Sequence, residues 1–276
     1  MTVTVAATCT ACGACIATCP ERALLPAPRR PAVIDVLCTD CLACLEVCPV
    51  DAIVPVPPGA PRSPGAPVVH PIEEASYRIL EQRVDLSGWA PGARDVVARM
   101  VHATADESFA GTARIGERAV TEAVGALAAG AVVVCDARMV VAGIPAVEGA
   151  VCLLGEVPVA APGDTRSAAA IRLAAERYAD GALWAIGNAP TALFALLELQ
   201  AAGKVRPAAV IGLPVGYVGA AEAKDALWTG PLGPVAITNS GVRGGSPVAA
   251  GAVNALVRLA GPARRYRASP MGFDLK

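Results

Sequence analysis

Cys9-Thr-Ala-Cys12-Gly-Ala-Cys15-Ile-Ala-Thr-Cys19-Pro20 and Cys38-Thr-Asp-Cys41-Leu-Ala-Cys44-Leu-Glu-Val-Cys48-Pro49 repeat one pattern, C-x2-C-x2-C-x3-C-P. A cubane [4Fe–4S] cluster is held by four thiolates, and in this pattern the fourth cysteine of each run ligates the cluster of the other run. The predicted ligand sets are Cys9, Cys12, Cys15 and Cys48 for one cluster, and Cys38, Cys41, Cys44 and Cys19 for the other. The proline after each run fixes the backbone where the chain leaves the cluster. The stretch therefore predicts two [4Fe–4S] clusters.

Two other uses of cysteine fit the pattern less well. A zinc site needs only four ligands, and its usual spacings do not include two quadruplets that each end in Cys-Pro. A disulfide framework belongs to secreted chains, and the start of the sequence, Met1 to Val5, does not resemble a signal peptide.

Residues 1–54 resemble a bacterial two-cluster ferredoxin. The resemblance implies a small α+β domain with pseudo-twofold symmetry that carries single electrons to and from a redox partner protein. The sequence does not identify that partner.

Composition limits the rest of the chain. With 276 residues, the protein has room for a second domain. The net charge of −1 gives no sign of nucleic-acid binding. The long uncharged run 182–197 contains Gly187 and Pro190 and is too short to span a bilayer, so we expect a cytoplasmic protein without a membrane segment. Cys135 and Cys152 lie outside the quadruplets in apolar runs and are expected to be reduced core residues.

Residues 55–70 are dense in proline and predict a semi-rigid linker, which leaves 71–276 as the second domain. In that domain short apolar runs alternate with helical patterns. The expected helices are 72–83, 91–103, 117–129, 166–178, 191–201, 220–228 and 247–260, and the expected strands are 131–135, 150–154, 183–186, 208–212 and 235–238. Continuous apolar strands indicate a parallel sheet covered on both faces. The prediction is a three-layer α/β domain, followed by a basic tail from Arg264.

Ligands of a parallel α/β sheet bind beyond the carboxyl ends of its strands. The segments expected there are rich in glycine and begin at Asp136, Gly155, Gly187, Gly212 and Asn239. Such turns expose N–H groups at helix N-termini, which suits anionic oxygens. No P-loop and no G-x-G-x-x-G after a strand is present, so the sequence favours a nucleotide less than a polycarboxylate.

Two arginines each allow two interpretations. Arg166 is expected in the first turn of a helix, where the helix dipole disfavours a cation. It is either a surface residue paired with Asp164 or a fork that holds a carboxylate. Arg243, in a glycine-rich turn, allows the same two interpretations.

The histidines are His70, in the linker, and His102, near the end of a predicted helix. His102 is either a solvated residue or a proton donor or acceptor, and the pattern alone leaves both open. No G-x-S-x-G elbow and no H-E-x-x-H run is present, so hydrolase and metallopeptidase chemistry has little support.

The same segments resemble precorrin-8X methylmutase, an isomerase family of cobalamin biosynthesis. The matching stretches include Val101-His102-Ala103, Val134-Cys-Asp-Ala137, Thr165-Arg166-Ser167, Gly187-Asn188-Ala-Pro190-Thr191-Ala-Leu-Phe194, Leu213-Pro214-Val-Gly216-Tyr-Val-Gly219 and Gly244-Gly245-Ser246. The resemblance covers nearly all of 71–262.

The resemblance implies a methyl shift from C11 to C12 of precorrin-8X, or of cobalt-precorrin-8, that gives hydrogenobyrinic or cobyrinic acid. It places the catalytic histidine at His102, a substrate-contacting serine at Ser76 and a carboxylate-binding arginine at Arg166. Further substrate-binding positions predicted at the strand ends are Asn188, Arg243, Gly244, Gly245 and Ser246. Family members are homodimers that bind the tetrapyrrole at the subunit interface, so we expect a homodimer.

A methyl shift transfers no net electrons, so the clusters are expected to serve a neighbouring redox step. One alternative is an electron carrier whose α/β domain docks to a corrinoid enzyme. Another is a flavin-dependent oxidoreductase, for which the sequence has no flavin signature.

Overall fold

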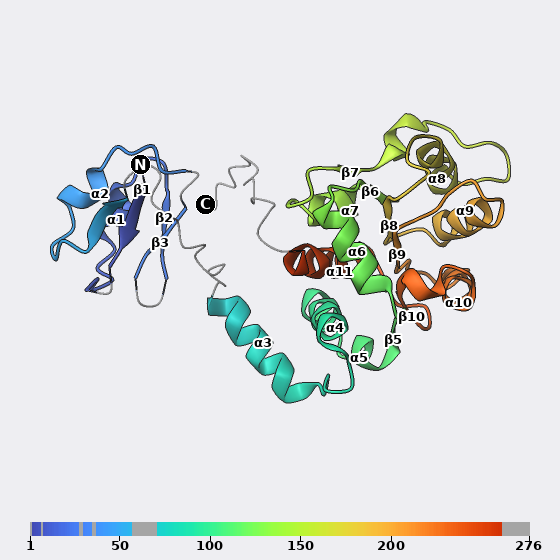
Figure 1. Ribbon diagram of the computed structural model, residues 1–276, viewed down its shortest axis with the longest axis horizontal. Helices are drawn as coiled ribbons and strands as arrows, with labels where there is room; N and C mark the ends of the chain where they lie inside the picture. The colour runs from blue at the N-terminus through green and yellow to red at the C-terminus, as the bar shows by residue number, and fades with distance from the viewer. Residues whose placement is uncertain (1, 7, 28–29, 35–36, 57–70, 261–276) are drawn as a thin grey trace. The chain divides into compact units, whose positions relative to one another are not determined.

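The computed structural model describes residues 2–6, 8–27, 30–34, 37–56 and 71–260, and the chain divides into two compact units, 1–79 and 80–276 (Figure 1). The division falls inside helix α3 (Pro71–Arg83). Of the predicted linker, Pro55 and Val56 end a strand, while 57–70, His70 included, lie outside the described residues. The basic tail from Arg264 lies outside them too. The predicted domain boundaries at 54 and 71 remain predictions.

The first unit contains two antiparallel strand pairs and two short helices. Strand β1 pairs with β4, and β2 pairs with β3. The elements are β1 (Thr2–Val5), α1 (Ala14–Thr18), β2 (Leu24–Leu25), β3 (Ala32–Val33), α2 (Ala43–Glu46) and β4 (Ile53–Val56). Its buried apolar core consists of Val3, Val5, Leu24 and Ile53 together with the thiols of Cys15 and Cys44.

The repeat in the sequence is also a repeat in the backbone. Helices α1 and α2 begin at the same place in each cysteine run, two residues after the second cysteine. The residue before each helix is left-handed, Gly13 with φ 80° and Leu42 with φ 58°. The two halves of the unit therefore follow one local plan.

The second unit is built on a six-stranded sheet with the order β5-β10-β9-β8-β6-β7. The strands are β5 (Ala113–Ile115), β6 (Val133–Cys135), β7 (Ala150–Val151), β8 (Leu183–Ile186), β9 (Ala209–Gly212) and β10 (Ala236–Asn239). All neighbours pair in parallel except β5, which is antiparallel to β10. From β6 the chain builds β7 on one side and β8, β9 and β10 on the other, so the order reverses between β6 and β8.

Helices cover both faces of this sheet, as Figure 1 shows. On strand β8, Leu183 and Ala185 join one core while Trp184 and Ile186 join the other. The first core includes residues of α4 (Pro91–Thr104), α6 (Ala119–Ala128), α7 (Arg138–Gly143) and α11 (Ser246–Leu259). The second includes residues of α8 (Arg166–Arg177), α9 (Pro190–Ala201) and α10 (Ala220–Thr229). The predicted three-layer α/β fold is confirmed.

The structure also contains elements that the sequence did not predict. Helix α5 (Ser108–Thr112) leads into β5, and the 3-10 turns η1 (Leu153–Glu156) and η2 (Gly233–Val235) join strands to helices. The strand expected at 150–154 ends at Val151, after which the chain turns into η1. The strand-end segment that begins at Asp136 continues into a helix that was not expected, α7, which starts at Arg138. Within the described ranges, no helix combines the length and apolar character needed to cross a bilayer.

Candidate active site and cluster-binding loops

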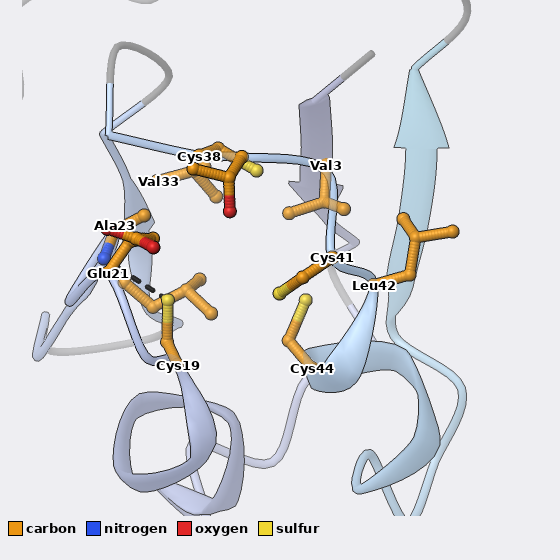
Figure 2. Close-up of a pocket in the computed structure, with 11 residues that line it drawn as sticks. Val3, Cys19, Glu21, Ala23, Val33, Cys38, Cys41, Leu42 and Cys44 are labelled. Atoms are coloured by element: carbon orange, nitrogen blue, oxygen red, sulfur yellow. Dashed lines mark hydrogen bonds between the residues drawn. The ribbon is translucent and has the colours of Figure 1, made fainter.

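Four thiols line one cavity of the first unit. Cys19 comes from the first run and Cys38, Cys41 and Cys44 from the second, and Figure 2 shows the sulfur atoms of Cys19, Cys41 and Cys44 directed toward one another. Apolar side chains close much of the wall, among them Val3, Leu24, Val33 and Leu42. In the described part of the chain, no three His, Cys, Asp or Glu side chains converge on a single metal-ion position. The four cysteines that line the cavity are the same four that the sequence predicts as ligands of the second cluster.

In the other predicted set, Cys15 is buried, Cys9 and Cys48 are half-buried and Cys12 is exposed. Burial raises the pKa of the Cys15 thiol, and the neighbouring Cys9 and Cys12 raise it further because like charges repel. Cys15 therefore lies close to both of its partners from the same run.

Backbone N–H groups converge on the cysteines. The amide of Ala23 donates to Cys19 Sγ at 3.2 Å, and the amide of Ala52 donates to Cys48 Sγ at 3.2 Å. Left-handed residues occur in pairs at equal positions of the two runs: Ala11 and Asp40, Gly13 and Leu42, Arg22 and Asp51. Left-handed turns direct successive amides inward and form anion-binding concavities. Thiolates and amide donors together fit two [4Fe–4S] clusters, whose sulfur atoms accept such hydrogen bonds.

In the second unit, a buried carboxylate lies where the strand order reverses. Asp136 follows β6, is 1% exposed and accepts hydrogen bonds from the amides of Gly187 (2.8 Å), Asn188 (2.9 Å) and Ala189 (2.7 Å). Burial raises the pKa of the Asp136 carboxyl, although the three N–H donors act in the opposite direction. These amides lie at the N-terminus of α9, a position that suits a bound anion. In this protein the buried carboxylate of Asp136 occupies that position.

The N-termini of α8 and α9 meet beside this turn. Thr165 caps α8 by accepting from the amide of Ala168, and its hydroxyl lies 2.7 Å from that of Thr191 in α9. Arg166 follows Thr165. Its guanidinium donates to the carbonyls of Val157 (2.7 Å) and Leu154 (3.1 Å).

The sequence also allowed Arg166 to pair with Asp164, and that pairing does not occur. Asp164 instead accepts from Arg172 at 2.5 Å, and the described residues contain no ion pair of Arg166. The Arg166 guanidinium is therefore held by neutral carbonyls at the edge of the site, with its charge available to an anion.

Arg243, in the turn after β10, is held through both its backbone carbonyl and its side chain. The backbone carbonyl of Arg243 accepts from Lys224 Nζ (2.5 Å) and Asn239 Nδ2 (3.1 Å). The Arg243 guanidinium donates to Asp106 Oδ2 and to Ser108 Oγ. Arg243 is thus an ion-paired residue, and the carboxylate of Asp106 already occupies part of its fork.

The glycines that follow fit a narrow space. A Cβ at Gly244 would collide with the carbonyl oxygens of Leu213 and Pro214. Gly245 has φ 126°, a conformation that favours glycine, and its amide donates to the Leu213 carbonyl at 2.8 Å. Ser246 then begins α11. The turn that follows β10 is therefore hydrogen-bonded to Leu213, the residue that follows β9, and packs tightly against it.

His102 lies half-buried in the last turn of α4. Helix α4 packs closely on α11, because a Cβ at Gly251 would lie 2.9 Å from Ala103 Cβ and 3.2 Å from the Arg99 carbonyl oxygen. Asp106, four residues after His102, binds Arg243. The end of α4 that carries His102 is therefore tied to the turn before α11. Ser76 is half-buried in the part of α3 that falls in the first unit.

The family of the second unit follows from comparison with known proteins. The family model described as "Precorrin-8X methylmutase" matches residues 71–259. The chain belongs to this family. A second model, "4Fe-4S dicluster domain", matches residues 8–52.

Relatives of the methylmutase part are similar over nearly their whole length. A precorrin-8X methylmutase of Sinorhizobium sp. is 44% identical over 68% of this chain and 93% of its own. One of Pseudomonas aeruginosa is 40% identical over 67% and 93%. A solved structure of precorrin-8X methylmutase from Thermus thermophilus aligns with a TM-score of 0.63 and 41% identity over 68% of this chain and 95% of that one.

Several methylmutase residues in these contacts had no role in the sequence prediction. Asp136 was noted only as part of a strand-end segment, and its position after a buried strand was the available signal. Lys224 stands in the apolar stripe of α10 with Ala220, Ala223 and Leu227, where a lysine is out of place. The hydrogen bond between Thr165 and Thr191 could not be predicted from the sequence, because it joins two residues that are 26 positions apart in the chain.

Proposed function

We propose that the chain moves the C11 methyl group to C12 of precorrin-8X to give hydrogenobyrinic acid, and that its N-terminal unit carries electrons through two [4Fe–4S] clusters. The family match over residues 71–259 carries the first part of this proposal. The Sinorhizobium and Pseudomonas relatives, named for precorrin-8X, are 44% and 40% identical, whereas the relatives named for cobalt-precorrin-8 are 29–37% identical, so we propose the metal-free substrate first.

The rearrangement is unimolecular, so the protein's work is orientation and one placed proton donor. We assign the donor role to His102, which would hydrogen-bond or protonate the macrocycle near ring C. Arg166 would bind a peripheral carboxylate, since its guanidinium is not neutralised by an ion pair among the described residues. The side-chain amide of Asn188 and the backbone amide of Gly244 would bind other carboxylates, since the backbone amides of Gly187, Asn188 and Ala189 already donate to Asp136.

Three further residues are proposed to contact the substrate. Ser76 is carried over from the family resemblance. Arg243 and Ser246 belong to the turn before α11, and Arg243 reaches a substrate carboxylate only by sharing its fork with Asp106.

The test is conversion of metal-free precorrin-8X by the anaerobically purified full chain, followed by visible absorbance. We expect His102→Ala to lower kcat by about 100- to 10,000-fold, the usual contribution of a general acid or base. His70→Ala is the matched control because it removes the other histidine of the chain. Full activity of His102→Ala would contradict the assignment, and inactivity of the natural chain on both metal-free and cobalt substrates would contradict the isomerase function.

In the first unit, Cys9, Cys12, Cys15 and Cys48 would hold one cluster, and Cys38, Cys41, Cys44 and Cys19 the other. Each cluster, when bound, takes up and releases single electrons. We propose that this serves a redox step next to the methyl shift, with a partner protein or a corrinoid as the exchange partner. Iron and sulfide analysis with electron paramagnetic resonance of the reduced chain should give two clusters per chain.

The family resemblance also supports a homodimer and a cytoplasmic location. Sedimentation velocity on the holoprotein tests the first, and a monomer at micromolar concentration would contradict it. Fractionation of cells that produce the chain tests the second.

A further inference from the structure

Lys224 is a buried cation whose hydrogen bonds go to neutral groups. It is 0% exposed, and its Nζ donates to Asn239 Oδ1 at 3.1 Å and to the Arg243 carbonyl at 2.5 Å. The adjacent Asp225 is turned to Arg114, with 2.5 Å between their charged groups. Burying an ammonium group is costly unless it is paired or well hydrogen-bonded. A hydrophobic residue at this position of α10 would avoid that cost, so the lysine needs another explanation.

The contacts of Lys224 indicate that it is needed to hold the turn after β10 in place. Asn239 Nδ2 donates to the carbonyls of Ser240 (2.9 Å) and Arg243 (3.1 Å). Lys224 therefore holds Asn239 through its amide oxygen and Arg243 through its carbonyl. These contacts fix the start and end of the turn that Gly244 and Gly245 complete.

The turn leads into a helix N-terminus that has an unsatisfied polar group. Ser246 begins α11, which runs for 14 residues, and it is 4% exposed. Among the described residues its Oγ has no hydrogen-bond partner. A helix N-terminus with a buried hydroxyl of this kind suits an anionic oxygen.

We propose that Lys224 is a positioning residue for substrate binding, which holds the Arg243–Gly245 turn and adds a buried positive charge that strengthens binding of a substrate carboxylate there. The inference rests on the proposed function, because it takes the ligand to be the polycarboxylate corrinoid.

The charge on Lys224 should depend on pH in a useful range. Burial lowers the pKa of Lys224 to about 8, Asp225 acts to raise it and Arg114 acts to lower it. The ammonium is therefore largely protonated at pH 7 and lost as pH rises above 8. Affinity for a carboxylate ligand should fall over the same interval.

The experiment is a visible-absorbance titration of the full chain with hydrogenobyrinic acid at pH 7, 8 and 9. We expect Lys224→Met to raise the Kd about 10-fold at pH 7, equivalent to about 1.4 kcal/mol. Lys224→Arg should restore part of the affinity, since it keeps the charge. Lys204→Met is the matched control because Lys204 is exposed just after the end of α9.

The pH profile separates a charge effect from a purely structural one. The Kd of the natural chain should rise more steeply from pH 7 to 9 than that of Lys224→Met. Equal slopes, or a Lys224→Met Kd within twofold of the natural value, would overturn the proposal. If that variant does not fold, a flat Kd for the natural chain from pH 7 to 9 would overturn it without any variant. A natural chain that neither binds hydrogenobyrinic acid nor isomerises precorrin-8X overturns the proposed function as well.

Discussion

The two units differ in which residues take the left-handed conformation. Among the described residues of the cysteine-rich unit these are one glycine and five other residues, Ala11, Arg22, Asp40, Leu42 and Asp51. In the described part of the methylmutase unit they are glycines with one exception, Ala105. A left-handed residue other than glycine costs about 1–2 kcal/mol. The first unit carries this cost repeatedly although its apolar core is small.

The difference indicates where each fold gets its stability. In the methylmutase unit, side chains packed on both faces of the sheet are sufficient, and glycine meets the steric demands of the turns. In the first unit, the strained turns surround the thiols, so we expect cluster ligation to offset their cost.

The largest expected effect is therefore that of cluster removal. Stripping iron with a chelator should unfold the cysteine-rich residues 2–56, because their small core cannot hold the strained loops alone. The methylmutase part that begins at Pro71 and includes Ser76 should stay folded and keep its isomerase activity. Limited proteolysis should then cut within 2–56 and spare 80–260. Loss of the methyl shift together with the clusters would show that the units are coupled and break the comparison.

The next largest effect concerns the carboxylate inside the methylmutase unit. Asp136→Asn should lower the free energy of unfolding by about 3 kcal/mol, because an amide offers one acceptor oxygen to three N–H donors and turns an NH2 group toward the rest. Urea unfolding measures it. Asp180→Asn is the control, since Asp180 forms an exposed pair with Arg206 that should contribute less than about 1 kcal/mol. Equal losses of unfolding free energy in the two variants would contradict a larger contribution from the buried carboxylate.

Lys224 gives a pH-dependent effect of intermediate size. Its pKa in the folded chain, about 8, lies below the ordinary value of 10.5, so the unfolded chain binds more protons between these pH values. The stability of the natural chain relative to Lys224→Met should therefore rise from pH 8 to 10.5, by about 1–3 kcal/mol. Urea unfolding of both chains across this range is the measurement, and a constant difference would argue against a buried ammonium.

The smallest effects test the backbone comparison itself. Arg22 is exposed with φ 51°, whereas Gly203 is exposed with φ 67° and has open space where a Cβ would lie. Arg22→Gly should be more stable than Arg22→Ala by about 1 kcal/mol, because glycine takes the left-handed conformation freely. Gly203→Ala should lose about the same amount. The rate of cluster loss compares Arg22→Gly with Arg22→Ala, and urea unfolding compares Gly203→Ala with the natural chain.

Local sequence pattern predicted much of the fold. The apolar run 183–186 is β8 with the expected bounds, and the helix expected from residue 166 begins at Arg166, with Thr165 as its N-cap. Strand β5 could not be predicted, because Ala113-Arg-Ile115 is short and its pairing with β10 is determined by tertiary contacts. For the same reason β7 is shorter than its apolar run.

The site was predicted less completely than the fold. Family resemblance placed His102 and Arg166, whereas pattern alone left each with two interpretations. The contacts of Asp136 with the Gly187 turn and of Lys224 with Arg243 join segments far apart in the chain. No local periodicity encodes such pairs, so they require coordinates.

The outer strands of the six-stranded sheet have a consequence for behaviour at high concentration. Strand β7 has two residues and β5 has three. A long exposed edge offers unpaired backbone groups to a second molecule and promotes aggregation, and short edges limit this. In a chain that is 54% hydrophobic, these brief edges restrict strand-to-strand association while the protein folds.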